Sequence, residues 1–193
     1  MRNGLLEFKN KILKRQTLAE GATFQERLPV DGLITHLYFR FDFASFSIGS
    51  GTVATLDGIL RAISKIIVEV DQTTIVKVTP SEQFHRTHIL NGTQPSFLQV
   101  ANGNAPFFSI EVPLVLPRPF YYPDSYLTAM PAGLIKNINV TIETPADFET
   151  AICSTAGTAA LGACTFSIEA RTAMVDEMWL RGHVARAGWA YVQ

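Results

Sequence analysis

The sequence predicts an all-β protein: an eight-stranded jelly-roll sandwich with short helical insertions and an N-terminal amphipathic helix. Long stretches alternate apolar and polar residues, as half-buried strands do. Thr, Val and Ile are plentiful and Phe occurs 13 times, which favours strands. No strand–helix–strand unit repeats along the chain. We expect residues 1–24 to form the helix and a linker, and residues 25–193 to form a single jelly-roll domain.

The length and the charge content indicate how many domains the chain forms and whether it contacts other subunits. The 193 residues suffice for one domain with a sizeable core. Only 17% of the residues are charged, less than the quarter usual for soluble domains. A surface so poor in charge indicates that other subunits cover part of it.

Residues 1–16 have the spacing of an amphipathic basic helix, because apolar side chains recur every three or four positions. Such a helix can lie on an anionic membrane or dock on a partner, or simply pack on its own domain. Deleting it is expected to leave the fold intact. The candidate membrane- or partner-binding residues are Arg2, Leu5, Phe8, Lys9, Lys11, Ile12, Lys14 and Arg15.

Charge is distributed unevenly between this segment and the rest of the chain. Residues 1–20 hold five basic and two acidic residues, whereas the remainder holds 11 basic and 15 acidic residues. The body is therefore not a basic nucleic-acid surface, and we expect no direct sequence-specific nucleic-acid binding.

After the N-terminal segment, the sequence predicts a linker over residues 17–27, a long strand, and a short helical turn followed by a hairpin. The long strand runs from Leu33 to Phe43 and has one clearly apolar face. The helical turn, "DGILRAIS", is too short for the crossover of a parallel sheet. The hairpin "KIIVEVDQTTIVKV" turns near residues 71–73.

The second half of the chain continues the pattern of strands and one short helix. A helix can start at Pro80 and end at Asn91-Gly92. A strand follows over 107–116, and Pro113 and Pro117 indicate an edge position or an early end. Further strands are expected over "LIKNINVTIET", "CTFSIEARTAMV" and residues 184–192.

The two cysteines, Cys153 and Cys164, flank a ten-residue loop of small residues that we expect to lie between two strands. They can form a disulfide if their Cα atoms are about 5.5–6 Å apart. Two free thiols acting as small hydrophobes are an equally good interpretation.

Catalytic and metal-binding patterns are weak. Glu82, His85 and His88 can share one face of a helix, but a polar helix surface is the better interpretation of that spacing. The sequence contains no GxSxG elbow and no phosphate-binding glycine loop. We therefore expect no enzyme, no cofactor, no metal site and no small-molecule substrate.

The order of the elements resembles a known family. The stretches "RLPVDGLITHLYFRFDF", "LDGILRAISKIIVEVDQTTIVKV", "FFSIEVPLVL" and "GLIKNINVTIETPADF", with the loop "PDSYLTAMPAG" before the last, resemble upright jelly-roll major capsid proteins of tailless icosahedral viruses with an internal membrane, bacteriophages included. The resemblance covers residues 25–175. Many members fuse two jelly rolls in one chain, so this sequence looks more like the branch with single jelly rolls.

The resemblance implies a viral capsid protein. Such a subunit would associate with itself, and with other capsid proteins, into capsomers of an icosahedral shell over the internal membrane. It would be made in the host cytoplasm and reside in the virion. A carbohydrate-binding jelly-roll module is the alternative, and a sandwich hydrolase a third interpretation. Candidate interface residues are Phe120, Tyr121, Tyr122, Trp179 and Trp189.

Overall fold

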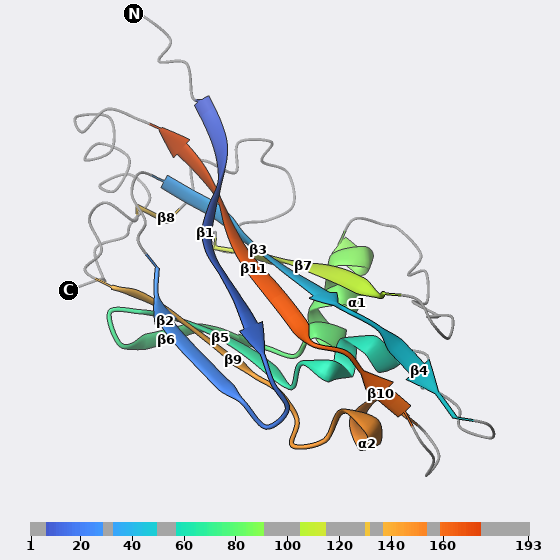
Figure 1. The fold of residues 1–193 in the computed structure, drawn as a ribbon. Coiled ribbons are helices and arrows are strands. Elements are labelled where there is room, and N and C mark those ends of the chain that lie inside the picture. Colours follow the sequence, from blue (N-terminus) through green and yellow to red (C-terminus); the bar gives the residue numbers. More distant parts are fainter. Residues whose placement is uncertain are drawn as a thin grey trace, which may run out of the picture.

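The structure is a computed structural model that describes residues 7–28, 33–49, 57–90, 105–114, 130–131, 137–153 and 159–174. Within these residues two antiparallel sheets pack face to face, and short helices lie at their edges and ends (Figure 1).

Sheet A contains the longest strands. Its order is β1 (Glu7–Leu18), β11 (Cys164–Met174), β3 (Leu33–Phe43) and β7 (Phe107–Pro113), and β8 (Met130–Pro131) also pairs with β3. Sheet B has the order β2 (Thr23–Arg27), β9 (Ile138–Glu143), β5 (Lys65–Val70) and β6 (Thr73–Val78). A separate ribbon joins β4 (Phe46–Ile48) to β10 (Ala159–Leu161).

The pairing of the eight main strands is nested. Taken in chain order, the first pairs with the eighth (β1–β11), the second with the seventh (β2–β9), the third with the sixth (β3–β7), and the fourth with the fifth (β5–β6). Rolling up such a ribbon of pairs gives the two sheets of a jelly roll. The predicted fold is confirmed, although β4, β8 and β10 bring the described strands above the eight expected.

Phenylalanine rings fill the space between the sheets. Phe24 of β2 meets Phe166 of β11 edge to face at 4.7 Å between centroids, which joins sheet B to sheet A. Phe41 packs on Phe108 within sheet A at 5.0 Å. Edge-to-face and tilted arrangements are the favourable ones for aromatic pairs. Among the residues that the structure describes, most of the Phe rings therefore lie in the core.

Strand β3 follows the predicted alternation except near its start. Register partners shift between Ile34 and His36 in the pairing with β11, so Thr35 is the extra residue of a β-bulge. The extra residue reverses the face of the sheet toward which Ile34 points. Ile34 is therefore fully buried on the same side as Leu37. Strict alternation would put Ile34 on the polar face together with His36.

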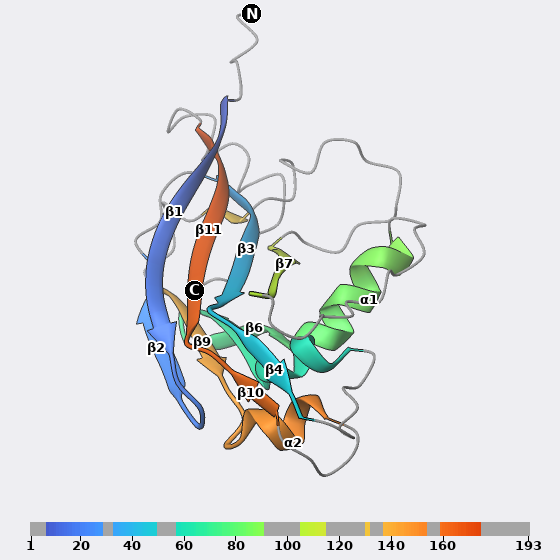
Figure 2. The same cartoon turned by 45° about the vertical axis from the view of Figure 1, so that its right-hand side comes forward.

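The predicted short helical insertions are present. The 3-10 turn η1 (Gly58–Ala62) packs beside α2 (Phe148–Ile152), and α1 (Pro80–Leu90) lies along β7 (Figure 2). Among the described residues, none of the helices is both long enough and apolar enough to cross a membrane.

The hairpin of β5 and β6 is confirmed. Asp71 and Gln72 form its two-residue turn with φ of 47° and 72°, the left-handed backbone that matches the twist of paired strands. The Asp71 carboxylate accepts a hydrogen bond from the Asn137 N–H at 2.8 Å. This bond offsets part of the cost of left-handed backbone at a residue other than glycine.

The predicted N-terminal helix is wrong for residues 7–16, because β1 occupies them and pairs with β11 along its whole length. A helix of that length is marginal by itself, whereas pairing with β11 satisfies the backbone groups on one side of the strand and fixes it to the sheet. Deleting residues 1–16 would therefore remove most of a sheet strand, so we expect this deletion to disturb the fold and not to leave it intact. Strand β3, expected to be the first of the jelly roll, is the third.

Residues 17–27 are not a linker. Leu18 and Phe24 are core residues, and β2 begins at Thr23, so the predicted domain boundary after residue 24 falls inside a strand. The Thr144 hydroxyl ties the intervening turn to β9: it donates to the Ala19 carbonyl at 2.7 Å and accepts from the Ala22 N–H at 2.8 Å.

The segment before Cys153 is also different from the expectation. It forms α2 rather than a strand, and Asp147 caps it by accepting from the Glu149 N–H at 2.8 Å.

Candidate functional site

Three of the four edge strands of the two sheets, β1, β6 and β7, carry features that hinder further strand pairing. β1 contains a bulge between Ile12 and Lys14, and β6 contains one at Ile75, which has no register partner on β5. Along β7, the buried Gln83 of α1 donates from Nε2 to the Glu111 carbonyl at 2.8 Å. Bulges and covering helices protect edge strands from pairing with other chains. At these three edges, contacts with neighbours are therefore expected to use side chains and loops.

Exposed apolar side chains lie on one side of the sandwich. Among the described residues, the large exposed ones are Phe107 on β7, Ile89 on α1 and Ile75 on β6, with exposed fractions of 59%, 74% and 42%. β7 is the edge strand of sheet A farthest from β1, and β6 is the edge strand of sheet B farthest from β2. Figure 2 shows β1 and β2 on one side and α1 with β7 on the other.

Phe107 belongs to a small patch of contacting side chains on the outer face of sheet A. The Arg40 guanidinium carbon lies 4.9 Å from the centre of the Phe107 ring. The same guanidinium donates to Asp42 Oδ1 from Nε at 3.0 Å and from Nη2 at 2.9 Å. A fixed Arg beside an exposed aromatic ring is typical of residues that dominate protein interfaces.

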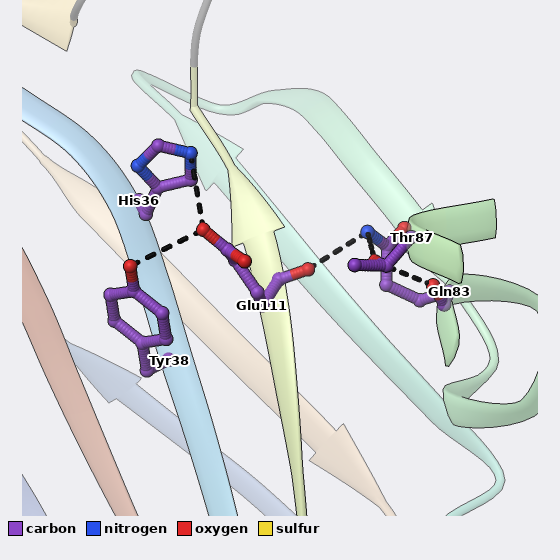
Figure 3. Close-up of polar contacts among 5 residues, drawn as sticks. All are labelled: His36, Tyr38, Gln83, Thr87 and Glu111. Atoms are coloured by element: carbon purple, nitrogen blue, oxygen red, sulfur yellow. Dashed lines mark hydrogen bonds and ion pairs between the residues drawn. The ribbon is translucent and has the colours of Figure 1, made fainter. Parts of the chain in front are cut away.

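Further along the same face, two polar side chains, His36 and Tyr38, converge on the Glu111 carboxylate (Figure 3). His36 Nε2 lies 3.3 Å from Glu111 Oε1, and the Tyr38 hydroxyl donates to the same oxygen at 3.2 Å. Across β11, Arg171 is the register partner of His36. Strand alternation puts His36 and Tyr38 on one face of β3, and the pairing with β7 brings Glu111 to them.

Burial decides the protonation of this cluster. It lowers the pKa of His36, an effect that the Glu111 charge opposes and the Arg171 charge reinforces. Burial also raises the pKa of Tyr38, and the Glu111 charge adds to the effect. The cluster therefore favours a neutral imidazole and a neutral phenol at neutral pH.

The predicted stripe of Glu82, His85 and His88 is engaged in local packing. The Glu82 carboxylate accepts from the Thr79 N–H at 3.0 Å, and the Phe84 ring contacts His85 and His88 with centroids 5.7 and 4.5 Å apart. Within the described part of the chain, no three His, Cys, Asp or Glu side chains are grouped to hold a metal ion.

Cys153 and Cys164 are free thiols in the structure, so the disulfide is not formed. Cys164 is fully buried, and burial raises its pKa to about 12, with a further contribution from the Asp42 charge. Partial burial and the Glu149 charge raise the pKa of Cys153 as well. Neither thiol is activated as a nucleophile.

The structure describes only some of the predicted interface and N-terminal residues. Phe120, Tyr121, Tyr122, Trp179, Trp189, Arg2 and Leu5 lie outside the described residues. Phe8, Lys9, Lys11, Ile12, Lys14 and Arg15 all belong to β1. Their roles in binding stay predictions.

Sequence reasoning missed the exposed residues of β7 and α1. The signal for Phe107 was available, since Phe107, Ser109 and Glu111 alternate with the buried Phe108 and Ile110. Two Phe residues in succession on a half-buried strand require one ring to face outward.

No protein-family model and no curated protein sequence matches the chain. Solved structures do. The STIV major capsid protein superposes with a TM-score of 0.64 at 16% identity, over 94% of this chain and 54% of that one. The PBCV-1 virus capsid superposes with a TM-score of 0.61 at 11% identity, over 95% of this chain and 46% of that one.

A third match is the major capsid protein P2 from Bacteriophage PM2, with a TM-score of 0.52 at 11% identity, over 88% of this chain and 52% of that one. The chain thus spans about half the length of the solved structures it matches. At such low identity the likeness concerns the fold. The 193-residue chain therefore shares the jelly-roll fold found in major capsid proteins of STIV and Bacteriophage PM2.

Proposed function

We propose that the chain is a viral capsid protein, a jelly-roll subunit that self-associates into capsomers of an icosahedral shell. The observation that carries the proposal is the fold match, which runs over 94% of the chain and about half of a major capsid protein. Half is the share expected when one jelly roll is compared with a chain that fuses two. The role is structural rather than enzymatic, and the location is the virion after synthesis in the host cytoplasm.

The two unlike sides of the sandwich support assembly by head-to-tail contacts. The side with β6, α1 and β7 presents Ile75, Ile89 and Phe107, while β1 on the opposite side is rich in basic residues. A contact between two different surfaces closes into a ring when the rotation allows it. Rings of subunits are what capsomers require, with this chain alone or with a second small capsid protein.

The basic N-terminal region is proposed to contact an anionic surface. It contains Arg2, Lys9, Lys11, Lys14 and Arg15, so anionic headgroups of an internal membrane or an acidic neighbouring subunit would attract it. Flotation with anionic and with neutral vesicles distinguishes these partners. Binding to anionic vesicles that salt abolishes supports the membrane, and no flotation supports the neighbouring subunit.

The aromatic residues Phe120, Tyr121, Tyr122, Trp179 and Trp189 remain proposed interface anchors, because large aromatic side chains dominate binding energy at interfaces. Alanine at Trp179 or Trp189 should weaken association while leaving the circular dichroism of the monomer unchanged. A loss of folding instead would assign these rings to the core.

The direct test is electron microscopy of the purified protein, combined with size-exclusion chromatography and light scattering. Ring-shaped capsomers or sheets are expected. A strict monomer at high concentration, with and without candidate companion proteins, would contradict the proposal.

A matched pair of variants tests the apolar side. Ile89→Lys should reduce assembly because it puts a charge on the exposed apolar side, whereas Ser64→Lys, at another exposed position, should assemble normally. Equal assembly of both variants would exclude this side from the contact.

A further inference from the structure

His36 holds an unusual position on the outer face of sheet A. Its side chain is only 18% exposed, and Nε2 lies 3.3 Å from Glu111 Oε1. The other ring nitrogen, Nδ1, is buried and has no hydrogen-bond partner in the described part of the chain. A neutral imidazole fits this site by donating from Nε2 and leaving Nδ1 bare.

Titratable and charged side chains of three strands lie around His36. β3 contributes Tyr38 and β7 contributes Glu111. β11 contributes Arg171, the register partner of His36, and Glu169, the register partner of Tyr38. The two charges that act on the His36 pKa, those of Glu111 and Arg171, are opposite in sign, so they offset each other without protonation of the imidazole. A proton on Nδ1 would add a second positive charge and a buried N–H without an acceptor.

Glu111 connects this cluster to the helix that covers the sheet edge. Its side chain meets His36 and Tyr38, and its backbone carbonyl accepts from Gln83 of α1 at 2.8 Å. The Thr87 hydroxyl, one turn further along α1, donates to the Gln83 carbonyl at 2.9 Å. Figure 3 shows this line of contacts from β3 through β7 to α1.

We propose that His36 is an acid-sensitive latch that holds β7 and α1 on sheet A and loosens them when the imidazole takes up a proton. The latch is a property of the isolated chain, so it stands or falls independently of the capsid role. Edge strands and the helices docked on them are the segments most able to open locally.

The direction of the effect follows from linkage. The folded chain holds the His36 proton less tightly than the unfolded chain, because its pKa is lowered from the ordinary 6.5. The stabilising contribution is therefore complete above pH 6.5 and is lost as the pH falls toward the folded pKa. Each unit by which the pKa is lowered corresponds to about a tenfold change in the opening equilibrium.

The test combines NMR titration of the His36 ring with amide hydrogen exchange at pH 7.5 and pH 5.5. We expect a titration midpoint below 6.5, and protection factors that fall several-fold at pH 5.5 in β7 and α1 but not in β5 and β9. A midpoint at or above 6.5, or an equal fall in all four elements, would overturn the proposal.

Two variants isolate the role of His36. His36→Gln keeps a donor toward Glu111 without a titratable ring, and it should abolish the selective loss of protection. His85→Gln, a change to a half-buried histidine outside the cluster, should retain it. Retention of the selective loss in His36→Gln would contradict the latch.

Should His36→Gln fail to fold, Glu111→Gln gives an independent readout. It preserves the shape of the side chain and removes the charge that favours the imidazolium. The loss of protection should then move to lower pH. No displacement, or a displacement to higher pH, would contradict the proposed role of Glu111 in the latch.

Discussion

The two faces of β3 differ completely in what they contain. The inner face carries Leu37, Phe39, Phe41 and Phe43, all buried in the core. The outer face carries four polar residues, and each of them contacts a specific partner: His36 and Tyr38 meet Glu111, and Arg40 meets Asp42 and Phe107. The inner face determines that a sandwich forms, since any well-fitting apolar set would do so. The outer face gives this particular sandwich its own chemistry.

The largest effect is expected on the inner face. Phe39→Ala should lower the free energy of unfolding by about 3–5 kcal/mol, because it removes a buried ring and leaves a cavity. Chemical denaturation measures the change. Phe107→Ala, at an exposed ring, is the control and should change it by about 0.5 kcal/mol or less. Similar losses for both variants would contradict the distinction between the faces.

A smaller effect is expected where the sheet edge meets α1. Gln83→Ala removes the donor to the Glu111 carbonyl and should lower the free energy of unfolding by about 1–3 kcal/mol. The reason is that Gln83 is buried, so its removal leaves a backbone acceptor unsatisfied. Denaturation curves measure it, with exposed Arg86→Ala as the control on the same helix. An unchanged midpoint would mean that water replaces the lost bond.

The next effect concerns the outer-face cluster itself. Tyr38→Phe removes the hydroxyl that donates to Glu111 and should cost about 0.5–1.5 kcal/mol, the net value of one hydrogen bond. NMR of the variant should also show a changed titration of His36, since both side chains meet the same carboxylate oxygen. A titration identical to that of the unaltered protein would separate Tyr38 from the cluster.

The smallest effect is expected for Arg40 and Asp42. Both side chains are well exposed, and exposed ion pairs contribute about 0–1 kcal/mol. A double-mutant cycle with Arg40→Ala and Asp42→Ala should give a coupling energy in that range. A value well above it would indicate that the pair is shielded from solvent and belongs with the buried contacts.

The elements that could be predicted from the sequence are those whose pattern is local. The alternation of β3, the β5–β6 hairpin and the start of α1 at Pro80 all depend on neighbouring residues. Pro113 correctly indicated that β7 lies at a sheet edge, because proline lacks the N–H that a central strand would need.

The elements that could not be predicted depend on distant partners. β1 has lysines and apolar residues at spacings that suit a helix as well as a strand, and the partner that decides between them, β11, begins at Cys164. The His36–Glu111 contact joins positions 75 residues apart (111 minus 36), and it depends on the register of β3 and β7, which sets Glu111 opposite Tyr38, two residues from His36. The bulge at Thr35 leaves no local signal.

The nested strand pairing also has a consequence for how the chain folds. The β5–β6 hairpin needs only two residues to close, whereas Glu7 and Met174 are 167 positions apart (174 minus 7). Pairs formed from the hairpin outward each close a short remaining gap, while forming β1–β11 first would close the whole chain at once. The edge strand that begins the described chain is therefore expected to be among the last to find its place, and it stays unpaired on the ribosome until β11 has been synthesised.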